Sequence, residues 1–414
     1  MNTFAKSILM NSSQKQQTSH ISQIVKGYSS EPVHLGTGVG DRGALISSRG
    51  QRSGAEEVKP LKPINQIKPI NQINNDKINN NQMCFTYLSD LLKNQTSIPQ
   101  LFDTSLRDGL QTISKDKHHL YTLERKKEMY DEIVFDYEPD AVEIGSIVNE
   151  SVLPIFSDSM DLFYYAEYVK HIKNMASSDS SPDHYILIPN MKQLLKVEND
   201  IKSGKLRCFS FITSTSNAFQ LKNTKKNLNE TKLELAEMIQ YLKKISPCYH
   251  KKSNPNSNPN PNPLKIKLYI SCIADCPISG LVPLNFILNE ILYYESRFGY
   301  MIDNICLSDT CGSLYPFDFK YIVDTCHQKF GYAYSKFGLH LHVNPTDEAR
   351  LNITKNILFA AFDRGLIYFD VSNMKEGGCS VTMTKDNLKP NLSYDYFYEC
   401  YLEWLQSMAI YKNK

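Results

Sequence analysis

Two histidines separated by one residue offer the clearest chemistry in this sequence. His340 and His342 lie in the segment FGLHLHV, residues 337–343. Alternate residues of a strand point to the same face, so both imidazoles can face one cavity. Two imidazoles and one carboxylate can hold a divalent cation, and such ligands fit Mg²⁺, Mn²⁺ or Zn²⁺. A purely structural role for both histidines is the alternative.

Asp108 is the candidate carboxylate, and it directly follows Arg107 after the apolar segment 100–105. A guanidinium beside a cation can stabilise the negative charge of an enolate or carboxylate in a transition state. A salt bridge to a neighbouring acid is the alternative role of this arginine. The pair predicts a charged site at the end of the first strand.

Cys379 is the third candidate for chemistry, because it follows two glycines. Glycine backbone freedom suits a loop that closes over a substrate. A small buried thiol is the alternative, and we expect that role for the other nine cysteines.

Eight strand-like segments alternate with amphipathic helical segments between residues 98 and 411. The expected strands are residues 100–105, 141–146, 184–189, 206–213, 266–273, 304–309, 337–343 and 366–372. The expected helices are residues 123–135, 158–175, 191–202, 230–245, 284–297, 317–330, 347–364 and 394–408. This alternation predicts an α/β fold, a (β/α)8 TIM barrel, with an open doubly wound sheet as the alternative.

In such a barrel the catalytic residues follow the carboxyl ends of the strands. Glu143 lies in the second expected strand, Asp309 ends the sixth and Asp370 lies in the eighth. Closure places the eighth strand beside the first and the seventh beside the eighth. We therefore expect Asp108, the two histidines and the loop after Cys379 to be neighbours.

Composition excludes several classes of protein. The chain has 414 residues, 41% hydrophobic and 22% charged, with a formal net charge of +2. This balance gives no reason to expect nucleic acid as a partner, and no apolar run is long enough to span a membrane. Ten scattered cysteines without a C-x-x-C pair favour reduced thiols in an intracellular protein.

Two segments are too biased in composition to join the fold. Residues 1–97 are rich in Ser, Gln, Asn and Gly and repeat KPINQI, so we expect a disordered, low-complexity extension. Residues 253–263, SNPNSNPNPNP, form an expected Asn/Pro insertion loop within the barrel domain, residues 98–411. The first 30 residues lack Asp and Glu, as organelle-targeting peptides do, but they also lack the Arg that such peptides carry, so we expect the cytoplasm rather than the mitochondrion.

The segment FDTSLRDGLQ, residues 102–111, resembles the D-x-T-L-R-D-G signature of the metal-dependent aldol/Claisen barrel family, of the pyruvate carboxyltransferase type. VEIGS, SCIADCPISG, SDTCG, GLHLHV and FDVSNMKEGGC follow in the family's order. The RDGLQ, C-P-x-x-G and G-G-C pieces resemble the 3-hydroxy-3-methylglutaryl-CoA lyase branch. The likeness covers residues 98–411.

The resemblance implies a role for each candidate residue. It implies a divalent cation, Mg²⁺ or Mn²⁺ before Zn²⁺, held by Asp108, His340, His342 and Asn387. It implies catalytic or supporting roles for Arg107, Cys379, Glu143 and Asp309, and we expect Gln111 and Asp370 to contact the substrate. The chain departs from the family after Cys379, where SVTMTKDN lacks the expected Pro and Gly.

Three functions compete at this stage. The first is a carbon-carbon lyase that cleaves 3-hydroxy-3-methylglutaryl-CoA or a related 3-hydroxyacyl-CoA to acetyl-CoA and a keto acid. The second is a Claisen-type synthase, resembling isopropylmalate or homocitrate synthases, that condenses acetyl-CoA with a 2-keto acid. The third is a degenerate barrel that serves as a binding protein. The sequence leaves open whether the chain forms a homodimer.

Overall fold

A computed structural model describes residues 98–176, 181–247, 263–378, 382–384 and 387–412. The expected extension of residues 1–97 lies outside these ranges, as does nearly all of the Asn/Pro insertion. Cys379 also lies outside the described residues. The structural statements below concern the described residues.

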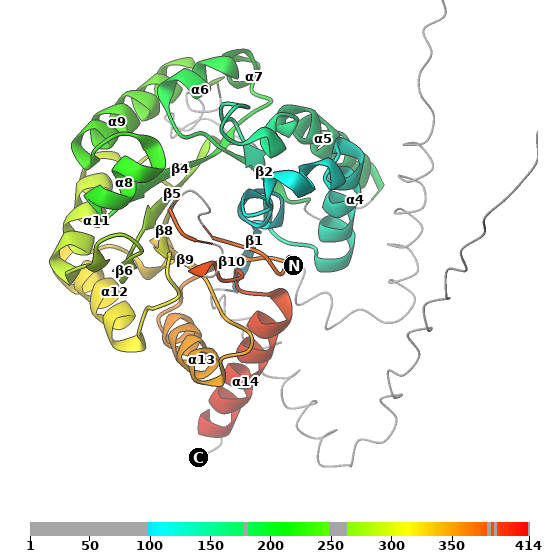
Figure 1. Cartoon of the computed structure of the whole chain (residues 1–414). Coiled ribbons are helices and arrows are strands. Elements are labelled where there is room, and N and C mark those ends of the chain that lie inside the picture. The colour runs from blue at the N-terminus through cyan, green and yellow to red at the C-terminus, as the bar shows by residue number, and fades with distance from the viewer. Residues whose placement is uncertain (1–97, 177–180, 248–262, 379–381, 385–386, 413–414) are drawn as a thin grey trace, which may run out of the picture.

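Eight parallel strands close into a barrel, which confirms the predicted fold (Figure 1). Their order around the barrel is β1-β10-β9-β8-β5-β4-β3-β2. Their bounds are β1 Gln100–Asp103, β2 Ala141–Ser146, β3 Asp183–Leu187, β4 Cys208–Ser214, β5 Lys265–Ser271, β8 Asn304–Asp309, β9 Phe337–Leu341 and β10 Tyr368–Val371. The first and last strands pair, so β1, β10 and β9 are neighbours as expected.

Helices surround the barrel between its strands (Figure 1). They are α4 Leu123–Glu132, α5 Ser159–Ala176, α6 Met191–Lys196, α7 Glu198–Lys202, α8 Asn217–Thr224, α9 Leu228–Ile245, α11 Leu284–Phe298, α12 Pro316–Phe330, α13 Glu348–Asp363 and α14 Tyr394–Lys412. The expected helix 191–202 is two helices that meet at Val197. Helix α8 and a short hairpin, β6 Asp275–Cys276 with β7 Gly280–Leu281, were not expected from the sequence.

The side chains of each strand divide between two cores. In β5, Ile266, Leu268 and Ile270 join the large apolar core beneath the helices. Tyr269 instead packs inside the barrel with Leu187 and Cys306. Because strand residues alternate between faces, Lys267 also faces the barrel interior. The interior of the barrel is therefore filled by side chains, and these include the polar side chain of Lys267.

One turn of π-helix, η1 Ser105–Gly109, follows β1 and carries Arg107 and Asp108. The two residues were expected at a strand end; they lie one turn beyond it. The carbonyl of Thr104 accepts the N–H groups of Arg107, Asp108 and Gly109 at 3.2, 2.8 and 3.2 Å. Single π-helical turns are rare and frequently mark functional sites. This turn directs two successive charged side chains into the barrel mouth.

None of the helices in the described part of the chain has both the length and the apolar character that a membrane crossing requires.

Candidate metal centre

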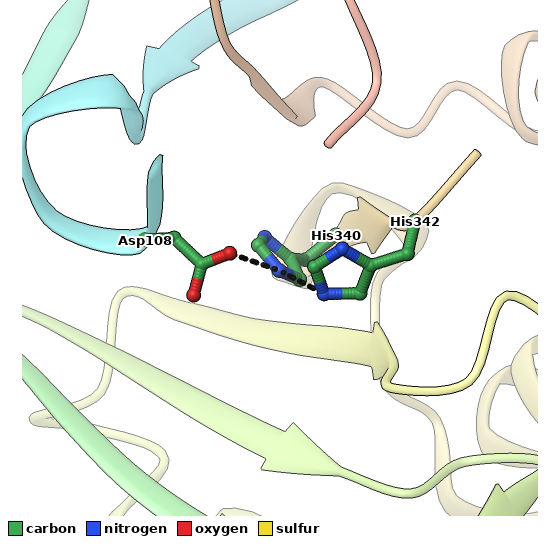
Figure 2. Close-up of side chains that lie close together, drawn as sticks. All are labelled: Asp108, His340 and His342. Carbon is green, nitrogen blue, oxygen red and sulfur yellow. Dashed lines mark hydrogen bonds and ion pairs between the residues drawn. The ribbon is translucent and has the colours of Figure 1, made fainter. Parts of the chain in front are cut away.

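Asp108, His340 and His342 converge at the carboxyl end of the barrel (Figure 2). One ligand atom from each lies within 4.8 Å of the other two. His340 Nε2 is 3.2 Å from His342 Nε2 and 3.9 Å from Asp108 Oδ2. All three residues are buried. The structure thus brings together the three ligands that the sequence predicted from different strands.

The hydrogen bonds of the two imidazoles define which nitrogens carry protons. His340 Nδ1 lies 3.0 Å from a carboxylate oxygen of Asp370, and His342 Nδ1 lies 3.1 Å from the carbonyl oxygen of Lys389. Carbonyl and ionised carboxylate oxygens only accept hydrogen bonds, so each Nδ1 donates. In the neutral rings both Nε2 atoms then carry lone pairs, and these lone pairs face each other.

Two facing lone pairs at this distance repel each other, and a cation between them would remove that repulsion. Ligand atoms that lie about 2.1 Å from one ion are roughly 3.0 Å apart at right angles and about 3.4 Å apart at the tetrahedral angle. The Nε2 separation of 3.2 Å falls between these values. The residues therefore fit a divalent cation.

The charge states of these three side chains also suit a divalent-cation site. Burial, together with the neighbouring His340, lowers the pKa of His342 to about 4, so that its imidazole is neutral at ordinary pH. Burial alone would raise the pKa of Asp108, but Arg107 and the two histidines outweigh burial and hold it below its usual range. A neutral imidazole and an ionised carboxylate are the forms that bind metal.

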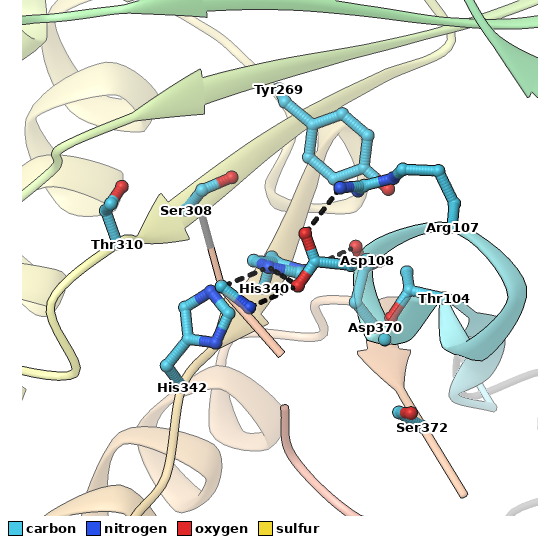
Figure 3. Close-up of polar contacts among 12 residues, drawn as sticks. Thr104, Arg107, Asp108, Tyr269, Ser308, Thr310, His340, His342, Asp370 and Ser372 are labelled. Carbon is cyan, nitrogen blue, oxygen red and sulfur yellow. Dashed lines mark hydrogen bonds and ion pairs between the residues drawn. The ribbon is translucent and has the colours of Figure 1, made fainter. Parts of the chain in front are cut away.

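Arg107 is held from two sides by buried acids, and Figure 3 shows its contact with Asp108. Its Nε donates to Glu143 Oε2 at 2.5 Å, and its Nη1 donates to Asp108 Oδ1 at 2.5 Å. Tyr269 donates to the same Glu143 oxygen at 3.1 Å, and its ring centroid lies 5.1 Å from the guanidinium carbon. The other oxygen of Glu143 is buried and has no hydrogen-bond partner among the described residues. Glu143 thus orients Arg107 beside the predicted cation.

The loop after β10 reaches the metal centre through its backbone. The N–H of Gly378 donates to Asp108 Oδ2 at 2.9 Å. Gly378 has φ +102°, a conformation that L side chains rarely adopt. The two glycines before Cys379 thus permit a turn that touches a metal ligand. The role expected for Cys379 itself falls on a residue outside the described ranges.

Asn387, the predicted fourth ligand, is exposed, whereas Asn391 is buried. Asn391 pairs with His342 in an antiparallel bridge. Directly opposed residues of such a bridge project to the same face, so the amide and the imidazole lie on one face of the pair. Neither side-chain atom of Asn391 has a hydrogen-bond partner in the described part of the chain. A buried amide without a partner is costly, which makes Asn391 the better candidate for the fourth ligand.

The sequence contained one signal that could have identified Asn391. This asparagine lies between Pro390 and Leu392, directly before the last apolar helix. Proline is tolerated at the first residue of a strand, and here the segment that starts at Pro390 extends the sheet. The N–H of Val343 donates to Pro390 O, and the N–H of Leu392 donates to Leu341 O.

Two other predicted residues have structural partners. Both carboxylate oxygens of Asp309 accept backbone N–H groups, from Ser313 and Leu314, each at 2.9 Å. Burial raises the pKa of Asp309, and these two N–H groups oppose that rise. Asp370 lies below the metal centre, bonded to His340 and Lys267. Neither Asp309 nor Asp370 is among the described residues that line the cavity above the metal centre, whereas Gln111 is.

That cavity has a volume of about 430 Å³. Its floor includes Arg107 and the three metal-ligand candidates. Its rim includes Lys222, Lys225 and Lys226, at and just beyond the end of α8. The cavity thus combines a cation site at the bottom with a basic edge at the mouth. This basic edge was not expected from the sequence, because α8 was not expected either.

Comparison with solved structures finds this fold in 3-hydroxy-3-methylglutaryl-CoA lyases. The lyase from Acinetobacter baumannii, in complex with coenzyme A and 3-methylmalate, is 19% identical, with a TM-score of 0.55 over 75% of this chain and 89% of that one. The Brucella melitensis lyase is 18% identical, with a TM-score of 0.55 over 77% and 98%. The Bacillus subtilis lyase is 20% identical, with a TM-score of 0.52 over 76% and 92%.

Identities at this level show a shared fold. No protein-family model and no curated protein matches the sequence.

Proposed function

We propose that this chain is a divalent-metal-dependent carbon-carbon lyase that cleaves 3-hydroxy-3-methylglutaryl-CoA or a related 3-hydroxyacyl-CoA. The observation that carries the proposal is the meeting of Asp108, His340 and His342 at the floor of an open cavity beside a clamped arginine. The solved lyases of the same fold support it. The products are acetyl-CoA and a keto acid.

The reaction breaks the bond between C2 and C3 of the acyl chain. The C3 hydroxyl loses its proton and becomes a carbonyl, while C2 leaves as the enolate of acetyl-CoA and then takes a proton. A bound divalent cation would supply Lewis acidity that lowers the pKa of the substrate hydroxyl. We assign ligation to Asp108, His340, His342 and Asn391, and Mg²⁺ or Mn²⁺ as the ion.

Arg107 stabilises the enolate in this proposal. Its guanidinium is held by Glu143 and Asp108, so it needs no reorganisation as negative charge develops on the thioester oxygen. Cys379 is the candidate for proton transfer at C2, because the neighbouring Gly378 contacts Asp108. Gln111 lines the same cavity and is assigned to substrate binding.

The lysines at the rim favour a substrate whose acyl group is attached to a phosphate-bearing carrier. Coenzyme A carries a diphosphate and a further phosphate at the end of a long arm, and Lys222, Lys225 and Lys226 line the mouth opposite the metal centre. Lysine binds phosphate as a point charge. Lys226 forms an ion pair with Glu234, which lines the same cavity, so we assign Lys222 and Lys225 to the nucleotide end of the substrate. The intracellular, cytoplasmic location and a possible homodimer stay predictions from the sequence.

An acyl-CoA cleavage assay with and without a chelator tests the proposal. Activity that disappears with chelator and returns with Mg²⁺ or Mn²⁺ supports the lyase. If product forms only from acetyl-CoA and a 2-keto acid, the chain is a synthase and not a lyase. If neither reaction occurs in a protein that binds the cation, the chain is a binding protein and the lyase proposal is wrong.

A further inference from the structure

A buried ion pair lies directly beneath the metal centre. Lys267 of β5 and Asp370 of β10 are each 2% exposed, and Lys267 Nζ donates to Asp370 Oδ1. The ammonium also lies 3.3 Å from the ring centroid of Phe102 and 4.5 Å from that of Tyr269. Replacing a buried ion pair by apolar residues is often neutral or stabilising, so the pair needs a reason other than stability.

The pair is connected to one metal ligand. Asp370 Oδ2 accepts from His340 Nδ1 at 3.0 Å, and Figure 3 shows these two side chains together. A continuous chain of contacts therefore runs from Lys267 through Asp370 to His340. His342 differs, because its Nδ1 donates to the backbone carbonyl of Lys389. The two imidazoles therefore have unlike supports. Only the support of His340 consists of side chains that carry charge.

We propose that Asp370 and Lys267 are positioning residues that fix the tautomer of His340 and thereby set the affinity of the cation site. This inference rests on the metal-dependent function proposed above, but it has a readout of its own in the metal-free protein. Asp370 holds the proton on Nδ1, which leaves the Nε2 lone pair for the cation. Lys267 holds Asp370 in place from the side opposite to His340.

Lys267 makes the proposal testable, because it determines how an amide at position 370 would orient. An ammonium group only donates, so in Asp370→Asn it takes the amide oxygen. The amide NH₂ then faces His340 Nδ1 and favours the tautomer with the proton on Nε2, which blocks the ligand lone pair. In Lys267→Met/Asp370→Asn no ammonium competes, and the amide oxygen can again accept from Nδ1.

The experiment is a Mn²⁺ titration of the full chain, combined with ¹⁵N NMR of the histidine side chains in the metal-free protein. We expect Asp370→Asn to weaken Mn²⁺ binding roughly 10–100-fold and to move the His340 proton to Nε2. The double variant should regain most of the lost affinity and the native tautomer. A merely structural role predicts no recovery, because the double variant removes more of the native contacts.

A second comparison does not depend on the single variant folding. Lys267→Met/Asp370→Asn and Lys267→Met/Asp370→Leu both remove the ion pair, and only the first keeps an acceptor for Nδ1. We expect the Leu form to bind Mn²⁺ roughly 10–100-fold more weakly than the Asn form. A matched control is Lys265→Met/Asp183→Asn, which removes another Lys–Asp pair of β5 at the opposite end of the barrel. The control should bind Mn²⁺ as the native chain does.

Equal Mn²⁺ affinity of the Asn and Leu forms would overturn the proposal. A native His340 with its proton on Nε2 would also overturn it, whatever the cation result. If the native chain instead binds Mn²⁺ with the expected tautomer but cleaves no acyl-CoA, the positioning role stands and only the lyase function fails.

Discussion

Replacing Arg107 should separate a catalytic contribution from a structural one. Arg107 is the partner of two buried acids, Glu143 and Asp108, whose side chains are 0% and 7% exposed. Arg107→Met leaves both acids without their positively charged partner. Breaking a buried ion pair costs roughly 3–5 kcal/mol, so we expect a loss of stability of about that size. Removal of one preorganised donor to a developing oxyanion also lowers kcat by about 10²–10³-fold.

The double variant Arg107→Met/Glu143→Gln distinguishes the two effects. Neutral glutamine removes the uncompensated charge of Glu143, so most of the lost stability should return in urea unfolding. Turnover at saturating metal should stay low, because no guanidinium faces the thioester oxygen. Loss of metal cannot explain low turnover, because removal of a positive charge beside Asp108 strengthens cation binding. Turnover within a few-fold of the native rate in the double variant would refute the role assigned to Arg107.

Four further predictions concern the candidate site. Asn391→Ala should weaken Mn²⁺ binding in a titration while Asn387→Ala leaves it unchanged, and the reverse pattern would restore Asn387 as the ligand. In the metal-free protein His342 should cost roughly 3 kcal/mol of stability as pH falls from about 6.5 to about 4, because the unfolded chain protonates His342 and the native chain does not; the difference in urea unfolding between the native chain and His342→Gln should change by this amount across the window, and a constant difference would contradict it. Lys222→Gln/Lys225→Gln should raise KM for the acyl-CoA at low salt without changing kcat, and an unchanged KM would remove these lysines from phosphate binding. Cys379→Ser should keep metal affinity and lower turnover, and equal loss of both would contradict its catalytic role.

The barrel was predictable because its signals are local. Near-continuous apolar strands alternate with amphipathic helices, and this pattern appears directly in the sequence. Most observed strand bounds differ from the expected ones by one or two residues, and β2 and β8 have the expected bounds. Convergence of Asp108, His340 and His342 then follows from closure, which makes β1, β10 and β9 neighbours.

Other features depend on contacts that no local pattern encodes. The π-helical turn at Ser105–Gly109 forms around the carbonyl of Thr104, and the break at Val197 divides an otherwise continuous helical pattern. The burial of Asn391 comes from its pairing with His342, which no count of residues from Cys379 reveals. The contact between Lys267 and Asp370 joins residues 103 positions apart across the barrel interior.

The central claim is that one cation is held by a carboxylate from the turn after β1 and two imidazoles from β9 and its end. Anomalous X-ray diffraction from crystals soaked in Mn²⁺ tests it most directly. We predict one strong peak per chain, about 2.0–2.3 Å from Asp108 Oδ2, His340 Nε2 and His342 Nε2. A peak elsewhere, or none at these three atoms in crystals saturated with Mn²⁺, would contradict the account.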